Sequence, residues 1–112
     1  MSGKLGRRAV VVGASIGGLS AAGALAGYFD RVDVVERDCL TGAVELRPGV
    51  PQARHPHGLL AGGLKALEAL YPGFATDLAA AGAVPVRIAQ EIRHERADVG
   101  VLPMRDLGHA IL

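Results

Sequence analysis

A glycine-rich hexapeptide at residues 13–18 constrains the fold more than any other part of the sequence. It reads GASIGG and follows a β-branched apolar run at residues 9–12, which is typical of a strand buried on both faces in a parallel sheet. After the hexapeptide, small and apolar residues recur at helical spacing as far as Ala26, and Ser15 carries an oxygen suited to capping that helix. The segment therefore predicts a strand, a tight turn and a helix.

A second apolar run at residues 32–36, VDVVE, predicts another strand, and Asp30 and Arg31 are expected to form the turn before it. Strand, helix and strand together predict a βαβ unit over residues 8–37 with a right-handed crossover. The fold class expected for the chain is α/β.

The rest of the chain predicts a loop, two helices and a partial antiparallel sheet. Prolines and glycines at residues 38–57 forbid long regular elements. Residues 58–82 return to helical spacing, interrupted by Tyr-Pro-Gly at 71–73, and their leucines form a core-facing stripe. Residues 84–104 predict a hairpin with strands at 84–93 and 99–104. The stripe comprises Leu59, Leu60, Leu64, Leu67 and Leu70.

Composition narrows the function classes. The 112 residues carry a net charge of +1, and 4% are aromatic with no Trp, which argues against a nucleic-acid-binding surface. The single cysteine, Cys39, forms no internal disulfide framework, so a reducing, cytoplasmic location is expected. His55 and His57 have alternating spacing but no further ligand nearby in the sequence, and no metal site is predicted.

Two alternatives for the N-terminus compete with a binding site. Residues 1–29, with basic residues before an uncharged stretch, allow a targeting or membrane-spanning segment, but five glycines in that stretch lower its hydrophobicity and helix propensity. Gly13, Ser15 and Gly17 also match the nucleophile elbow G-x-S-x-G, with Ser15 as the nucleophile. Only twelve residues precede Gly13, however, so no earlier strand–helix loop completes an oxyanion hole.

The favoured interpretation is the dinucleotide fingerprint G-x-G-x-x-G, with Ser15 in place of the second glycine. Gly13 permits the tight turn, Gly18 lets the helix pack on the strand, and the N–H groups of residues 15–17 suit a pyrophosphate. Glu36, 23 residues after Gly13, is placed to accept hydrogen bonds from an adenosine ribose diol. The predicted cofactor-binding residues are Gly13, Ala14, Ser15, Ile16, Gly17, Gly18 and Glu36. Glu36 disfavours a 2′-phosphate, which leaves NAD and FAD open.

Residues 10–18, 36–38, 47–57 and 67–74 resemble FAD-dependent monooxygenases of the aromatic hydroxylase type, and most closely the bacterial flavin epoxidases that include polyether epoxidases. The most specific block is RPGVPQARHPH at 47–57, and the resemblance covers roughly residues 8–86. It implies a Rossmann-like FAD-binding unit, with Arg37 near the adenosine, Arg54 near the phosphates or ribityl chain, and His55 or His57 near the flavin. In the complete enzyme, reduced FAD would activate O₂ and insert one oxygen atom into an alkene or aromatic substrate.

The resemblance covers only the start of such enzymes, so the expected fold is incomplete and no catalytic residue is assigned. The chain is expected to be a fragment, or one piece of a split protein, that needs the remainder of the flavoprotein or a complementary subunit. The alternatives are a stand-alone NAD- or FAD-binding module and a small secreted or membrane protein that uses residues 1–29 for targeting.

Overall fold

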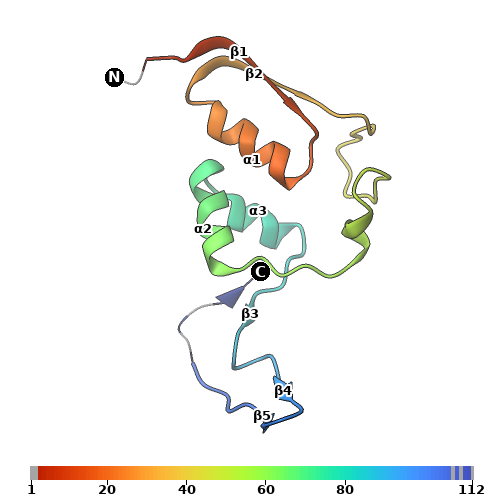
Figure 1. Ribbon diagram of the computed structural model, residues 1–112, viewed down its shortest axis with the longest axis vertical. Coiled ribbons are helices and arrows are strands. Elements are labelled where there is room, and N and C mark those ends of the chain that lie inside the picture. The colour runs from red at the N-terminus through yellow and green to blue at the C-terminus, as the bar shows by residue number, and fades with distance from the viewer. Residues whose placement is uncertain (1–2, 107, 109, 112) are drawn as a thin grey trace. The chain divides into compact units, whose positions relative to one another are not determined.

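The computed structural model has a mixed α/β architecture and describes residues 3–106, 108 and 110–111 (Figure 1). The chain divides into two units, Met1–Pro56 and His57–Leu112, which are considered separately below. The first unit contains β1 (Gly6–Val12), α1 (Ile16–Leu25), β2 (Phe29–Val35) and the 3₁₀ helix η1 (Pro51–Arg54). The second contains α2 (Ala61–Leu70), α3 (Phe74–Ala80), β3 (Val86–Arg87), β4 (Glu95–Arg96), β5 (Gly100–Val101) and β6 (Ala110–Ile111).

In the first unit, β1 and β2 pair in parallel, and α1 connects them and packs against both strands. The register runs from Gly6 opposite Phe29 to Val12 opposite Val35. The strand–helix–strand arrangement predicted for residues 8–37 is thus confirmed, at residues 6–35.

The prediction that the first strand is buried on both faces is wrong for this chain. Val11 is 8% exposed, whereas Val10 and Val12 are 54% and 84% exposed. Because side chains alternate along a strand, Val11 lies on the face that α1 covers and its two neighbours lie on the other face. The register places Val35 on that second face as well, beside Val12.

The second strand begins at Phe29, so Asp30 and Arg31 belong to β2 and not to the turn that was predicted for them. The turn lies earlier, where the Tyr28 N–H donates to the Leu25 carbonyl at 2.9 Å. Asp33 forms an ion pair with Arg8 across the two strands and a second with Arg31 of its own strand. Strand pairing and these ion pairs offset the low strand propensity of the charged residues.

The two helices predicted for residues 58–82 are present and separate at the expected position. Gly73 has φ +93° between them, and the Glu68 carboxylate accepts hydrogen bonds from the N–H groups of Gly73 at 2.7 Å and Ala75 at 2.9 Å. α2 begins at Ala61, so Leu60 precedes the helix and is 62% exposed. Of the predicted leucine stripe, Leu67 is buried, and Leu59, Leu64 and Leu70 are half-buried.

The hairpin predicted between strands 84–93 and 99–104 is wrong in its pairing, because the first strand of the observed hairpin lies at residues 95–96, inside the predicted turn. β4 pairs antiparallel with β5, while β3 pairs antiparallel with β6, so residues 84–93 do not form one continuous strand. Glu91 accepts the Arg87 N–H at 2.7 Å and pairs with its guanidinium at 2.8 Å. These contacts fold the chain into a turn directly after β3, where Ala89 has φ +64°.

Candidate functional site

The turn between β1 and α1 depends on two glycines. Gly13 has φ +97°, a region that favours glycine, and its N–H donates to the Val35 carbonyl at 2.7 Å. A Cβ on Gly18 would lie 1.9 Å from the Gly13 carbonyl oxygen, so only glycine allows α1 to approach the turn this closely. Both glycines have the local roles that their spacing predicts.

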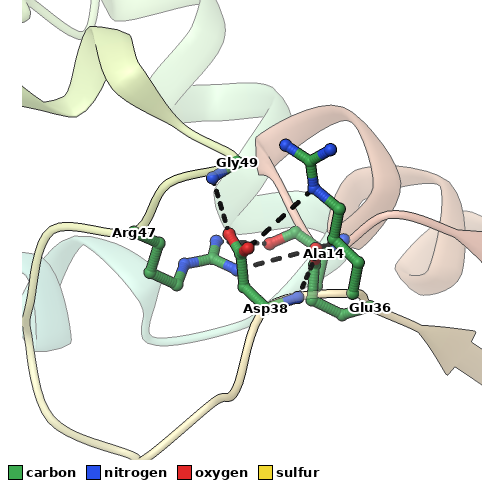
Figure 2. A network of polar contacts seen from close by, with 6 residues as sticks. Ala14, Glu36, Asp38, Arg47 and Gly49 are labelled. Carbon is green, nitrogen blue, oxygen red and sulfur yellow. Dashed lines mark hydrogen bonds and ion pairs between the residues drawn. The ribbon is translucent and has the colours of Figure 1, made fainter.

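Glu36 follows β2 and joins this turn to the segment after the second strand (Figure 2). One carboxylate oxygen accepts the Ala14 N–H at 2.6 Å and the other accepts the Asp38 N–H at 3.0 Å. The Asp38 and Ala14 N–H groups hold the pKa of Glu36 below its ordinary value despite partial desolvation, and Arg47 contributes further. Glu36 is therefore an anion at neutral pH, with its side chain 12% exposed.

Arg47 completes a polar network around Ala14, which is itself 4% exposed. Its Nη2 donates to the Ala14 carbonyl at 3.0 Å, and its Nη1 lies 3.6 Å from Glu36 Oε2. Sequence reasoning missed this arginine as a site residue, because nothing local indicates that it returns to a turn 33 positions earlier. The signal present in the sequence was its place at the start of the 47–57 block.

The loop that carries Arg47 is closed at its base by Asp38 and Gly49, also drawn in Figure 2. Asp38 Oδ2 accepts the Gly49 N–H at 2.8 Å, and a Cβ on Gly49 would lie 2.5 Å from that oxygen. The carboxylate can approach the backbone this closely because residue 49 is glycine. We call residues 38–49, joined by this contact, the clasped loop.

A pocket of about 230 Å³ lies at the carboxyl ends of β1 and β2. It brings together four of the residues singled out from the sequence: Gly13, Ser15, Glu36 and Arg37. Its complete lining is Val12, Gly13, Ser15, Glu36, Arg37, Gly49 and Val50. A second pocket of about 260 Å³ lies under the clasped loop and is lined by Ala14, Leu19, Cys39, Leu40, Thr41, Gly42, Ala43, Glu45 and Arg47.

Ser15, which lines the first pocket, occupies the N-cap position of α1, but its side chain makes no capping hydrogen bond, so the capping role predicted for it is wrong. Three further candidates lie outside this pocket. Ile16 and Gly17 begin α1 and are exposed. Arg54 is exposed in η1 and does not line the pocket.

The fold and site together define an α/β protein with a pocket, lined by both apolar and charged residues, at the carboxyl ends of two parallel strands. No family model matches the chain. Over 85 aligned residues the chain is 46% identical to Protein Rv3254 of Mycobacterium tuberculosis, an alignment that covers 73% of this chain and 18% of that protein. The chain thus spans under a fifth of that relative's length.

In the part of the chain that the structure describes, none of the helices combines the length and apolar character needed to cross a bilayer.

Proposed function

We propose that the first unit is a Rossmann-like nucleotide-binding unit that holds the ADP moiety of FAD. The observation that carries the proposal is the 230 Å³ pocket, where the left-handed Gly13, the start of α1 and the anionic Glu36 meet. In open α/β sheets, ligands bind outside the carboxyl ends of the strands, which is where this pocket lies.

The turn fits a pyrophosphate. Gly18 leaves no Cβ between α1 and the turn, and the first turn of α1 carries no acidic residue that would repel a phosphate. The Ser15 side chain does not satisfy the backbone donors at the start of α1. These N–H groups, together with the helix dipole, favour an anionic ligand.

Glu36 fits an adenosine ribose. The Ala14 and Asp38 N–H groups each bond one oxygen of the Glu36 carboxylate, and the Arg37 N–H also interacts with it. An ionised carboxylate has about four acceptor positions, so acceptor capacity is left for a ribose hydroxyl, while the negative charge disfavours a 2′-phosphate. The site therefore favours FAD or NAD over NADP.

The sequence blocks at 36–38 and 47–57 support FAD as the cofactor. They also support an FAD-dependent monooxygenase of the aromatic hydroxylase type, close to the polyether epoxidases, as the class of enzyme. When bound, FAD would supply the activation of O₂ for oxygen insertion into an alkene or aromatic substrate. In this proposal, a cytoplasmic flavoprotein uses the present residues to bind and orient the ADP end of the cofactor. Other residues of the flavoprotein, in the same chain or in a complementary subunit, form the rest of the site.

Calorimetric titration of the 112-residue chain with ADP, FAD, NAD and NADP tests the proposal. We expect ADP and FAD to bind, NADP to bind at least about tenfold more weakly than NAD, and Glu36→Gln to remove most of that discrimination. Arg93→Gln, which removes an exposed charge from the second unit, is the matched control and should change nothing. Failure of ADP to bind would overturn the proposal, and NAD binding without FAD binding would favour a stand-alone NAD module.

A further inference from the structure

We propose that Arg47 is a positioning residue, which orients the Glu36 carboxylate toward the nucleotide without contacting the nucleotide itself. This inference rests on the proposed function and deepens it. It starts from the polar network in Figure 2, where the side chains of Glu36 and Arg47 both reach the backbone of Ala14.

The three residues form a closed ring. Glu36 accepts the Ala14 N–H at 2.6 Å, Arg47 donates to the Ala14 carbonyl at 3.0 Å, and the two side chains approach each other at 3.6 Å. Both polar backbone groups of Ala14 are thus held by side chains from outside its own turn. Removing any one member leaves the other two with fewer constraints.

The geometry requires an arginine. The planar guanidinium presents Nη2 to a carbonyl and Nη1 to a carboxylate at the same time, which a lysine ammonium on a flexible stem does not reproduce. Nη1 is buried, lies 3.6 Å from Glu36 Oε2 and makes no hydrogen bond within the described residues. The contribution of Nη1 is therefore its charge, placed beside the carboxylate.

Arg47 is placed to act through its neighbours. It does not line the 230 Å³ pocket, whereas Glu36 does, and its side chain is 20% exposed. It lines the pocket under the clasped loop instead. The contact between Asp38 and Gly49 closes that loop two residues beyond Arg47 and so limits where the guanidinium can lie.

The first test uses nuclear magnetic resonance of the ligand-free chain. The Ala14 amide proton should resonate downfield, because its hydrogen bond to a carboxylate is short and charge-assisted. Arg47→Gln should move this proton upfield and raise the pKa of Glu36, and Arg47→Lys, which keeps the charge, should move the proton while the pKa of Glu36 stays low. Arg93→Gln is the control and should change neither. An unchanged Ala14 proton in both Arg47 variants would overturn the proposal.

The second test is a double-mutant cycle on ADP affinity with Arg47→Gln and Glu36→Gln. Arg47→Gln alone should weaken binding by roughly tenfold, the effect expected when a charged hydrogen-bonding partner is lost. The double variant should bind no more weakly than Glu36→Gln, because Arg47 acts through Glu36. Additive losses would mean that Arg47 acts independently of Glu36 and would overturn the proposal. Absence of ADP binding in the unsubstituted chain would instead overturn the proposed function, while the resonance test would still decide whether Arg47 orients Glu36.

Discussion

Glu36 accepts the backbone N–H of Ala14 at 2.6 Å, across 22 positions of sequence. The contact joins the residue that follows β2 to the turn that follows β1, and the same carboxylate also accepts the N–H of Asp38. The Glu36 carboxylate thus forms hydrogen bonds with both the turn after β1 and the turn after β2. Their geometry depends on the ionisation of that single group.

Acid should destabilise the chain by protonating the carboxylates of Glu36 and Glu68, which accept hydrogen bonds from backbone N–H groups. The Asp38 and Ala14 N–H groups lower the pKa of Glu36, and the Ala75 and Gly73 N–H groups lower that of Glu68, each from an ordinary value of 4.5. The folded state therefore prefers the ionised forms, and this stabilisation is fully present above about pH 4.5 and is lost as the pH falls through the lower folded-state pKa values. Urea unfolding between pH 7 and pH 3 measures the effect. Glu68→Gln should flatten the pH dependence, and an unchanged slope would contradict the role given to Glu68.

Gly18→Ala should destabilise the first unit by roughly 1–3 kcal/mol or more, because the new Cβ would lie 1.9 Å from the Gly13 carbonyl oxygen and α1 must shift. Gly17→Ala is the matched control, since a Cβ there meets nothing within 4 Å. In α1 this control should be neutral or stabilising by up to about 1 kcal/mol. Chemical unfolding of both variants measures the difference, and equal stabilities would contradict the close packing of α1 on the turn.

Ser15→Ala should change the free energy of unfolding by no more than about 0.5 kcal/mol, because the side chain makes no capping hydrogen bond. A serine that caps a helix would cost about 1 kcal/mol when replaced by alanine. A loss of that size in chemical unfolding would show that the hydroxyl does cap α1 in solution.

Substitutions at Ser15 also show whether its side chain strengthens nucleotide binding through a hydrogen bond or weakens it by crowding the pyrophosphate. A hydroxyl that donates to a phosphate would make Ser15→Ala weaken ADP binding by about fivefold, the value of one hydrogen bond. Ser15→Gly should then bind ADP no better than the unsubstituted chain. A large gain in affinity for Ser15→Gly would instead mean that the side chain crowds the pyrophosphate.

The local elements could be predicted from the sequence because each depends on nearby residues. Gly13 and Gly18 act within one turn and one helix, and Gly73 lies between α2 and α3 as the N-cap of α3. The position of Glu36 also follows from spacing, since the residue after β2 returns to the same edge of the sheet as the turn after β1.

The features that were missed depend on contacts between distant residues or on what covers a surface. Arg47 reaches Ala14 only because the clasped loop turns back, and the short β3 reflects an ion pair between Arg87 and Glu91. The apolar composition of β1 predicted two buried faces, but burial depends on the elements that pack there, and α1 covers one face. The roles expected for Arg37 and Arg54 toward FAD stay predictions.

Within the first unit, the face of the β1–β2 sheet opposite α1 has two halves of different character. The register places Arg8 and Arg31 on it near the amino ends, with Asp33 between them, and Val12 and Val35 at the carboxyl ends. Any surface complementary to this face would need an apolar part next to the nucleotide pocket and an acidic part at the far end. The sheet thus specifies both the composition and the direction of whatever packs on it.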